Sequence, residues 1–203
     1  MSGKSILITG NGGHAVSCRE VIESVEDLVF SGFVTKDGTE NGPDVIGTDQ
    51  DLESIFQNTK LACVGMGQIK TNEHRVRSFN QLKQIGYTLP VIIASTAYVA
   101  DSAKIHEGTI IMHRAFVNSQ TIIGINSIIN TGAIVEHGAN VGNHCHVATK
   151  VTINGDASIG DNSFIGSGAT LLQGVKVGKN CIVGAGVIVK KDLERGSILK
   201  WVL

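Results

Sequence analysis

The sequence is poor in several residue types that mark particular classes of protein. It has two prolines, four cysteines, one tryptophan and two tyrosines among 203 residues. It also has no run of basic residues, and its formal net charge is −1, which argues against nucleic acid as a partner. The apolar run near the N-terminus ends at Gly10 and is too short for a signal peptide or a membrane span. We therefore expect a cytoplasmic protein with no membrane insertion.

Glycine, by contrast, is abundant at 25 residues, and residues 97–192 repeat with a period of six. The third place of every hexad is aliphatic: Val99, Ile105, Ile111, Val117, Ile123, Ile129, Val135, Val141, Val147, Ile153, Ile159, Ile165, Leu171, Val177, Val183 and Val189. The first place is small or β-branched, and the sixth favours glycine, asparagine and aspartate, which tolerate a left-handed backbone at a corner. This period fits neither an amphipathic helix nor a simple strand. It predicts a parallel β-helix of hexapeptide repeats.

The four cysteines, Cys18, Cys63, Cys145 and Cys181, lack the spacing of a metal site. Cys145 and Cys181 occupy the same inward place of the repeat. If one coil takes eighteen residues, two layers separate them, roughly 10 Å, which is beyond the reach of a disulfide. We therefore expect these two to be buried free thiols, and we predict no bound metal.

Residues 1–92 follow a different pattern, in which apolar strands alternate with helices. The expected strands lie at 5–9, 28–34, 60–64 and 88–93, and the expected helices at 14–26, 48–56 and 72–85. The first helix would turn Val16, Val21 and Ile22 inward. Asn72 would cap the third helix, and Gly86 would end it.

This alternation predicts an α/β N-terminal domain over residues 1–92, a small Rossmann-like parallel sheet with helices on its faces. Residues 93–203 would form the β-helix domain with a C-terminal cap. The open end of a β-helix exposes strand edges, so we expect the tail with Trp201 to cover that end.

Histidines within the repeats are the first candidates for chemistry. His137 occupies the fifth place of its hexad, at a corner, and should project outward, whereas His146 should point outward from a flat side. A corner histidine can act as a general base near neutral pH, although an exposed polar residue on a turn is the simpler interpretation. A zinc site needs three convergent ligands, and the spacing of His113, His137 and His144 does not supply them.

Four segments in order, GNGGHA, VGMGQIKTN, NTGAIVEH and HVAT, carry a resemblance over nearly the whole chain. The sequence resembles the sugar acyltransferase family that includes bacterial UDP-4-amino-sugar N-acetyltransferases and sialic acid O-acetyltransferases. The resemblance implies a left-handed β-helix, acetyl-CoA as co-substrate and a homotrimer. It also implies N-acetylation of a 4-amino group on a nucleotide-linked amino-deoxy sugar, for surface glycan biosynthesis.

In that family a corner histidine takes the proton from the acceptor as the acceptor attacks acetyl-CoA. The matching residue is His137, and Glu136 and Asn130 are candidates for orienting its imidazole. The family usually has an acidic residue directly after this histidine, but this chain has Gly138. Either activity is slower than is typical or another carboxylate substitutes.

The resemblance also implies binding residues for both substrates. Acetyl-CoA would lie in a groove between neighbouring prisms, lined by His146, Gly155, Ser167 and Ala185. Lys150, Lys176 and Lys179 are candidates for its phosphates. The nucleotide sugar would meet Gly12, Gly13, His14, Gly65, Met66 and Gly67, with backbone amides at a helix start that suit a pyrophosphate. Thr35 and Lys36 stand where the family commonly has paired aspartates, which leaves the nucleotide sugar open.

Other functions remain open from the sequence. One is O-acetylation of a sialic-acid-like sugar. Another is a weakly active or non-catalytic nucleotide-sugar-binding trimer, which Gly138 motivates, and a third is a zinc-dependent lyase on the same β-helix. Dinucleotide binding is disfavoured because the glycine fingerprint that starts at Gly10 has Ala15 at its last position.

Overall fold

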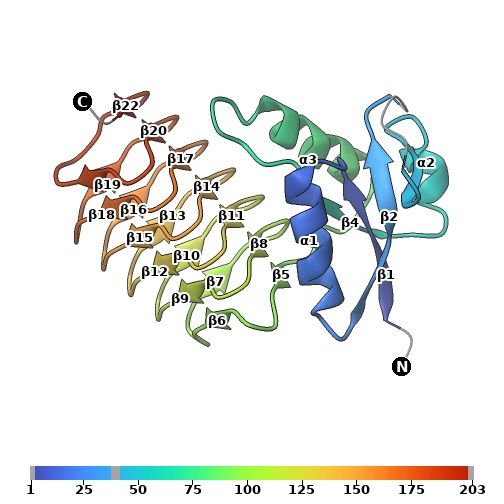
Figure 1. The fold of residues 1–203 in the computed structure, drawn as a ribbon, viewed down its shortest axis with the longest axis horizontal. Helices are drawn as coiled ribbons and strands as arrows, with labels where there is room; N and C mark the ends of the chain where they lie inside the picture. Colours follow the sequence, from blue (N-terminus) through green and yellow to red (C-terminus); the bar gives the residue numbers. More distant parts are fainter. Residues whose placement is uncertain (1–2, 38–41, 201–203) are drawn as a thin grey trace.

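The computed structural model describes residues 3–37 and 42–200, which form an α/β domain followed by a left-handed parallel β-helix (Figure 1). The sheet of the N-terminal domain is parallel, with strand order β3-β2-β1-β4. Its strands are β1 (Lys4–Thr9), β2 (Leu28–Thr35), β3 (Val45–Thr48) and β4 (Leu61–Val64). The predicted fold class is confirmed.

Helices cover both faces of this sheet, α1 (Gly13–Glu23) on one face and α2 (Leu52–Ile55) and α3 (Glu73–Ile85) on the other. Side chains alternate along β1, so Ile8 packs with α1 while Leu7 packs with α2 and α3. All of these side chains are buried. Burying each one contributes about 1.5–3 kcal/mol, which fixes the helices on the sheet.

The β-helix is a three-sided prism of two-residue strands, and each face is one parallel sheet. Face 1 consists of β5 (Ile92–Ile93), β8 (Ile110–Ile111), β11 (Ile128–Ile129), β14 (His146–Val147), β17 (Phe164–Ile165), β20 (Ile182–Val183) and β22 (Ile198–Leu199). Face 2 consists of β6 (Tyr98–Val99), β9 (Phe116–Val117), β12 (Ile134–Val135), β15 (Thr152–Ile153), β18 (Thr170–Leu171) and β21 (Ile188–Val189). Face 3 consists of β7 (Lys104–Ile105), β10 (Ile122–Ile123), β13 (Asn140–Val141), β16 (Ser158–Ile159) and β19 (Lys176–Val177).

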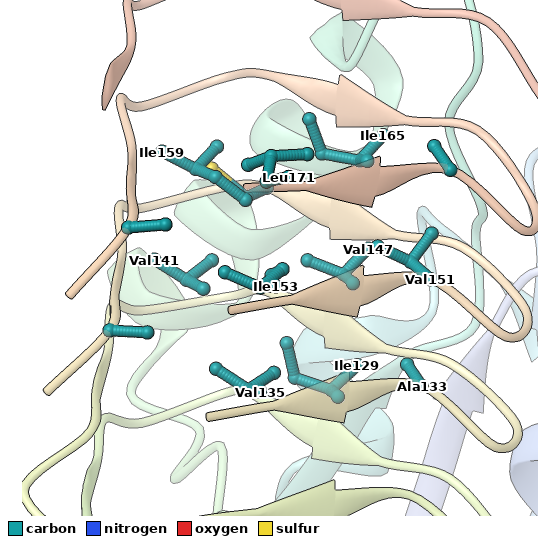
Figure 2. Packing of buried hydrophobic residues seen from close by; sticks show 14 of the residues in the cluster. Ile129, Ala133, Val135, Val141, Val147, Val151, Ile153, Ile159, Ile165 and Leu171 are labelled. Carbon is teal, nitrogen blue, oxygen red and sulfur yellow. The ribbon is translucent and has the colours of Figure 1, made fainter. Parts of the chain in front are cut away.

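The aliphatic third place of each hexad fills the interior of this prism, as the period predicts. Figure 2 shows the layers, in which Val141, Ile153 and Val147 from three different faces meet at one level. All three are fully buried. Cys145 and Cys181 are also fully buried and are free thiols, which confirms their predicted state.

Successive coils are joined in an eighteen-residue register by backbone hydrogen bonds at both the strands and the corners. At one corner, for example, the Asp156 N–H donates to the His137 carbonyl at 3.0 Å. Many corners need a left-handed backbone, and eight residues other than glycine adopt one with φ between 51° and 63°: Arg114, Gln120, Asn126, His144, Lys150, Asp156, Asn162 and Asn180. The corner therefore accepts side chains as well as glycine.

The N-terminal domain packs on face 1, along the flank of the first coils. Helix α1 lies between its own sheet and the prism (Figure 1), in one apolar cluster with Ile92, Ile110 and Ile128. Farther along the prism, the Gln68 amide donates to the His144 carbonyl at 2.9 Å. The same face is therefore covered over several coils, which leaves faces 2 and 3 free of the N-terminal domain.

The structure corrects three expectations for the N-terminal half, which concern one predicted strand, one strand that was missed and the orientation of Val16. The strand predicted at 88–93 is not continuous, because Thr88 forms only an isolated bridge with Leu61, and β5 belongs to the prism. Strand β3 was not predicted from the sequence. Val16 is 47% exposed rather than inward, because α1 turns that side to solvent.

The predicted helix ends are confirmed in part. Asn72 stands at the N-cap of α3 as predicted, but its side chain makes no capping hydrogen bond and its amide donates to Asn162 Oδ1 at 2.7 Å. Gly86 ends α3 with φ of 110°, and its N–H donates to the Leu82 carbonyl. Helix α2 begins later than predicted, at Leu52, since the Asp51 carboxylate accepts hydrogen bonds from the Thr48 backbone N–H and hydroxyl.

The far end of the prism carries β22, which pairs with β20 and extends face 1. The predicted cover by Trp201 lies outside the described residues. No helix in the described part of the chain has both the length and the apolarity that a membrane crossing needs.

Candidate active site

His137 lies at the corner between faces 2 and 3, where β12 leads into β13, and its side chain is exposed as predicted. The imidazole lies against Gly155 of the next coil, because a Cβ at Gly155 would be 2.6 Å from Cε1 and 2.7 Å from Nε2. A hollow of about 620 Å³, the corner pocket, opens beside it. Its lining residues are Glu136, His137, Asn154, Gly155, Leu172 and Gln173. A basic group therefore faces an open, substrate-sized space.

The two residues expected to orient this imidazole have other partners. The Asn118 amide donates to Glu136 Oε2 at 2.6 Å. The Asn130 amide donates to Nε2 of His146 at 3.1 Å. Glu136 still lines the corner pocket, but Asn130 belongs to the contact between face 1 and the N-terminal domain, so its expected contact with His137 is corrected.

His146 does point outward from a flat side, but it is only 7% exposed because the N-terminal domain covers face 1. Its Nδ1 donates to the Gln68 carbonyl at 2.8 Å, and its Nε2 accepts from Asn130. Burial, together with the nearby Arg75 guanidinium, lowers the pKa of His146 to about 4 despite the Gln68 hydrogen bond. In the single chain, this neutral ring is therefore enclosed at the contact between face 1 and the N-terminal domain.

The other residues expected to bind acetyl-CoA lie at two different corners. Gly155 is beside His137, between faces 2 and 3. Ser167 and Ala185 are exposed at the corner between faces 1 and 2, on successive coils. Lys150 shares their corner, whereas Lys179 is paired with Asp161 at 2.7 Å. One chain alone does not gather these residues into one groove.

A second hollow, the sheet-edge pocket, lies at the carboxyl ends of the N-terminal strands and has a volume of about 260 Å³. It is lined by Gly10, Asn11, Gly12, Lys36, Asp49, Met66, His74, Arg77, Ser78 and Gln81. Gly12, Lys36 and Met66 were expected from the sequence, whereas the contributions of α3 and Asp49 were not. Residues of a helix face that turn toward a pocket carry no local sequence signal.

The chemistry of this pocket suits an anion. Gly12 is the N-cap of α1 and makes no side-chain cap, so the first N–H groups of the helix remain available to a ligand. Lys36 and Arg77 add positive charge at the same opening. Asp49 is the acidic group there, and burial raises its pKa although Lys36 acts in the opposite direction.

Several residues expected at this pocket serve packing instead. Thr35 is fully buried, and its carbonyl accepts from the Asp49 N–H. Gly65 lets the end of β4 meet α1, because a Cβ there would lie 2.7 Å from the Cβ of Ala15. Gly13, by contrast, is exposed as the first residue of α1, and its N–H is among those available to a ligand. Of the expected residues, Gly12, Lys36 and Met66 line the pocket.

His14 and Gly67 lie at the junction with the prism rather than in the sheet-edge pocket. A Cβ at Gly67 would be 3.7 Å from the His14 ring, and the His14 and His146 rings are 6.1 Å apart. Burial and the charge of Arg75 lower the pKa of His14 to about 3. His14 is therefore a neutral ring in this structure.

Arg75 organises this junction. The residue is 1% exposed, and its guanidinium donates to the carbonyls of Val64 at 2.7 Å, Met66 at 2.8 Å and Asn126 at 3.1 Å. Among the described residues it has no ion pair with a carboxylate. The first two carbonyls belong to the N-terminal domain and the third to the prism, so one side chain joins the two.

Within the described ranges, no group of three or more histidine, cysteine, aspartate or glutamate side chains could hold a metal ion.

Comparisons with known proteins match both halves of the chain. The family model described as the PglD N-terminal domain matches residues 5–82, and the hexapeptide repeat of succinyl-transferase matches residues 157–191. No curated protein matches significantly.

Solved structures match almost the entire chain. PerB from Caulobacter crescentus, in complex with CoA and GDP-perosamine, is 30% identical with a TM-score of 0.89, over 96% of this chain and 92% of that chain. The acetyltransferase domain of PglB from Neisseria gonorrhoeae FA1090, in complex with acetyl coenzyme A, is 28% identical with a TM-score of 0.87, over 97% and 96%. WeeI from Acinetobacter baumannii AYE, at 17% identity and a TM-score of 0.57, covers 92% and 94% and shares the fold.

Proposed function

Since the chain belongs to the hexapeptide-repeat sugar acyltransferase family, we propose that it transfers the acetyl group of acetyl-CoA to the 4-amino group of a nucleotide-linked amino-deoxy sugar. Its biological setting would be surface glycan biosynthesis. The observation that carries this proposal is the exposed imidazole of His137, which stands over Gly155 at the mouth of the corner pocket.

The reaction needs a base at that place. As the sugar amine attacks the thioester carbonyl, an N–C bond forms and the C–S bond breaks. The His137 imidazole takes the proton that the amine loses and returns it to the sulfur of the leaving CoA. This scheme requires no covalent intermediate on the protein.

The sheet-edge pocket is the proposed site for the nucleotide. The free N–H groups at the start of α1, with Lys36 and Arg77, would hold the diphosphate. Asp49 would accept hydrogen bonds from the base or ribose. The bound GDP-perosamine of the Caulobacter crescentus relative supports a ligand of this class.

The relative placement of the two sites supports a homotrimer. In a three-sided prism, the corner between faces 2 and 3 lies opposite face 1. The sheet-edge pocket belongs to the domain packed on face 1, while His137 lies at the opposite corner. A second copy would have to bring its nucleotide to this histidine.

The surface of face 2 supports the same assembly. Its outward residues include Tyr98, which is 55% exposed and stacks on Phe116 with ring centroids 5.0 Å apart. Ile134 extends this apolar strip on the next coil, and Ile188 lies three coils farther along the same face, beyond Thr152 and Thr170. An apolar strip on a flat face is a suitable surface for another copy of the chain. Such a contact would also bring the corners that carry Gly155 and Ser167 of different copies together around acetyl-CoA.

Replacing His137 with alanine tests the catalytic proposal. The rate of acetyl transfer is measured from the release of the CoA thiol, with a panel of nucleotide amino sugars that includes GDP-perosamine. This rate should fall by about 10²–10⁴-fold. Binding of the nucleotide sugar, measured by calorimetry, should remain. A variant as active as the parent protein would refute the role of His137. Transfer to a sugar hydroxyl, with none to amines, would favour O-acetylation.

A further inference from the structure

The structure explains why a glycine stands at position 138, directly after His137. Its φ is 66°, but the equivalent corner places hold Gln120 and Asp156 with φ of 59° each, so the backbone does not demand glycine. A Cβ at Gly138 would overlap Oδ1 of Asp156. The absence of a side chain at Gly138 thus makes room for the carboxylate of Asp156, from the next coil.

This placement puts Asp156 beside His137. The imidazole reaches up from its own coil onto Gly155, and the carboxylate reaches down from the coil above onto Gly138. His137 and Gly138 are consecutive, and so are Gly155 and Asp156. The His137 and Asp156 side chains therefore lie next to each other and point in opposite directions along the prism. The Asp156 N–H also donates to the His137 carbonyl at 3.0 Å, which fixes the two coils in this register.

The other groups at this corner leave Asp156 as the available charge. Glu136 is the second carboxylate, and its Oε2 accepts from Asn118 of the coil below. Uncharged residues occupy the remaining equivalent places on the adjacent coil below and on the two coils above, at Asn118, Ser119, Gln120, Asn154, Leu172, Gln173 and Gly174. Asp101 holds the place equivalent to His137 two coils below, roughly 10 Å away. In the described part of the chain, the Asp156 carboxylate accepts no hydrogen bond.

We propose that Asp156 is a positioning residue that supplies, from the neighbouring coil, the negative charge that stabilises the imidazolium formed by His137 during transfer. This inference rests on the proposed function. The carboxylate takes no proton itself. Its effect is electrostatic, since a negative charge beside the ring favours the protonated form of the imidazole.

The test compares Asp156→Asn, which keeps the shape and removes the charge, with Asp192→Asn. Asp192 occupies the same corner place two coils farther on, roughly 10 Å away. Asp156→Asn should lower kcat/KM for GDP-perosamine or the best panel substrate by about fivefold. It should also move the acid limb of the pH profile to lower pH. Asp192→Asn should change neither.

A second variant distinguishes charge from local structure. Exchanging the two residues, as Gly138→Asp with Asp156→Gly, returns the carboxylate to the corner from the same coil as His137 and should restore both the rate and the pH profile. The NMR titration of the His137 Cε1–H signal in the free protein gives the same comparison without a substrate, and its midpoint should fall in Asp156→Asn.

The outcomes separate this inference from the proposed function. If His137→Ala abolishes transfer while Asp156→Asn matches the parent protein in rate, pH profile and NMR titration, the role of Asp156 is refuted and the catalytic proposal stands. If His137→Ala transfers the acetyl group as fast as the parent protein, the catalytic role of His137 is refuted and the inference about Asp156 fails with it. If the parent protein acetylates none of the nucleotide amino sugars, the proposed function itself fails.

Discussion

At the scale of single residues, His146 shows how hydrogen-bond partners fix a protonation state. A carbonyl oxygen can only accept, so Nδ1 carries the proton that it donates to Gln68. An amide N–H₂ can only donate, so Nε2 accepts from Asn130 and has no room for a second proton. The ring is therefore held neutral, in agreement with its lowered pKa.

This neutral ring predicts a pH dependence of stability. The pKa of His146 is about 4 in the folded protein and 6.5 in its ordinary state, so as the pH falls the unfolded chain binds the proton first. The contribution of His146 is complete above pH 6.5 and is lost as the pH falls toward 4. In His146→Gln, the loss of unfolding free energy between pH 7.5 and pH 5.5 should be smaller by about 1.5 kcal/mol. Chemical denaturation at the two pH values measures it.

The matched control is His74→Gln, which changes an exposed histidine on α3. It should leave the pH dependence as in the parent protein. Equal pH dependence in His146→Gln and the parent would contradict the assigned state of the ring.

At the scale of elements, α3 connects the two domains through Arg75. Replacing Arg75 with methionine removes hydrogen bonds to the carbonyls of Val64, Met66 and Asn126 while keeping an apolar stem. Because these bonds come from a charged, buried donor, the free energy of unfolding should fall by about 3 kcal/mol or more. Thermal and chemical denaturation would measure this loss.

Arg77→Met provides the comparison on the same helix. Arg77 is exposed at the sheet-edge pocket, so its replacement should change stability by less than about 0.5 kcal/mol. Equal losses in the two variants would show that Arg75 does not join the domains.

The sequence was informative where one period or one signal decides the structure. The third-place residues identify the prism strands because each coil repeats the same environment, and Gly86 marks the end of α3 because it adopts a positive φ. Strand β3 carries no such signal. It has only four residues, and the segment before it is rich in glycine and aspartate, which are typical of turns.

In the candidate site, too, some features could be predicted from the sequence and others could not. The outward position of His137 follows from its place in the hexad. The burial of His146 depends on how the N-terminal domain packs on face 1, which no local pattern encodes. The carboxylate of Asp156 is eighteen residues from Gly138, so only the stacked coils bring the two together.

At the scale of the whole molecule, the opposite placement of the two pockets predicts complementation between inactive copies. Gly12→Phe should block the sheet-edge pocket without displacing its neighbours, since a Cβ at Gly12 would have nothing within 4 Å. It should be inactive alone, as should His137→Ala. After the two variants are unfolded and refolded together in equal amounts, about a quarter of the parent activity should return, because one in four random interfaces pairs an intact pocket with an intact histidine.

A site contained within one chain would give no recovery in that mixture, since every copy would lack one part. Refolding each variant separately and then mixing briefly, without exchange of subunits, is the control and should stay inactive. Recovery there would mean that folded assemblies exchange subunits during the mixing.

The position of the N-terminal domain on face 1 also has a kinetic consequence. If His137 receives its substrate from a neighbouring copy, a lone chain can hold a nucleotide sugar but cannot acetylate it. Specific activity would then depend on the concentration of the protein and fall steeply on dilution, while the affinity of each chain for nucleotide stayed constant. The cell would obtain an active catalyst only after enough copies had accumulated to assemble.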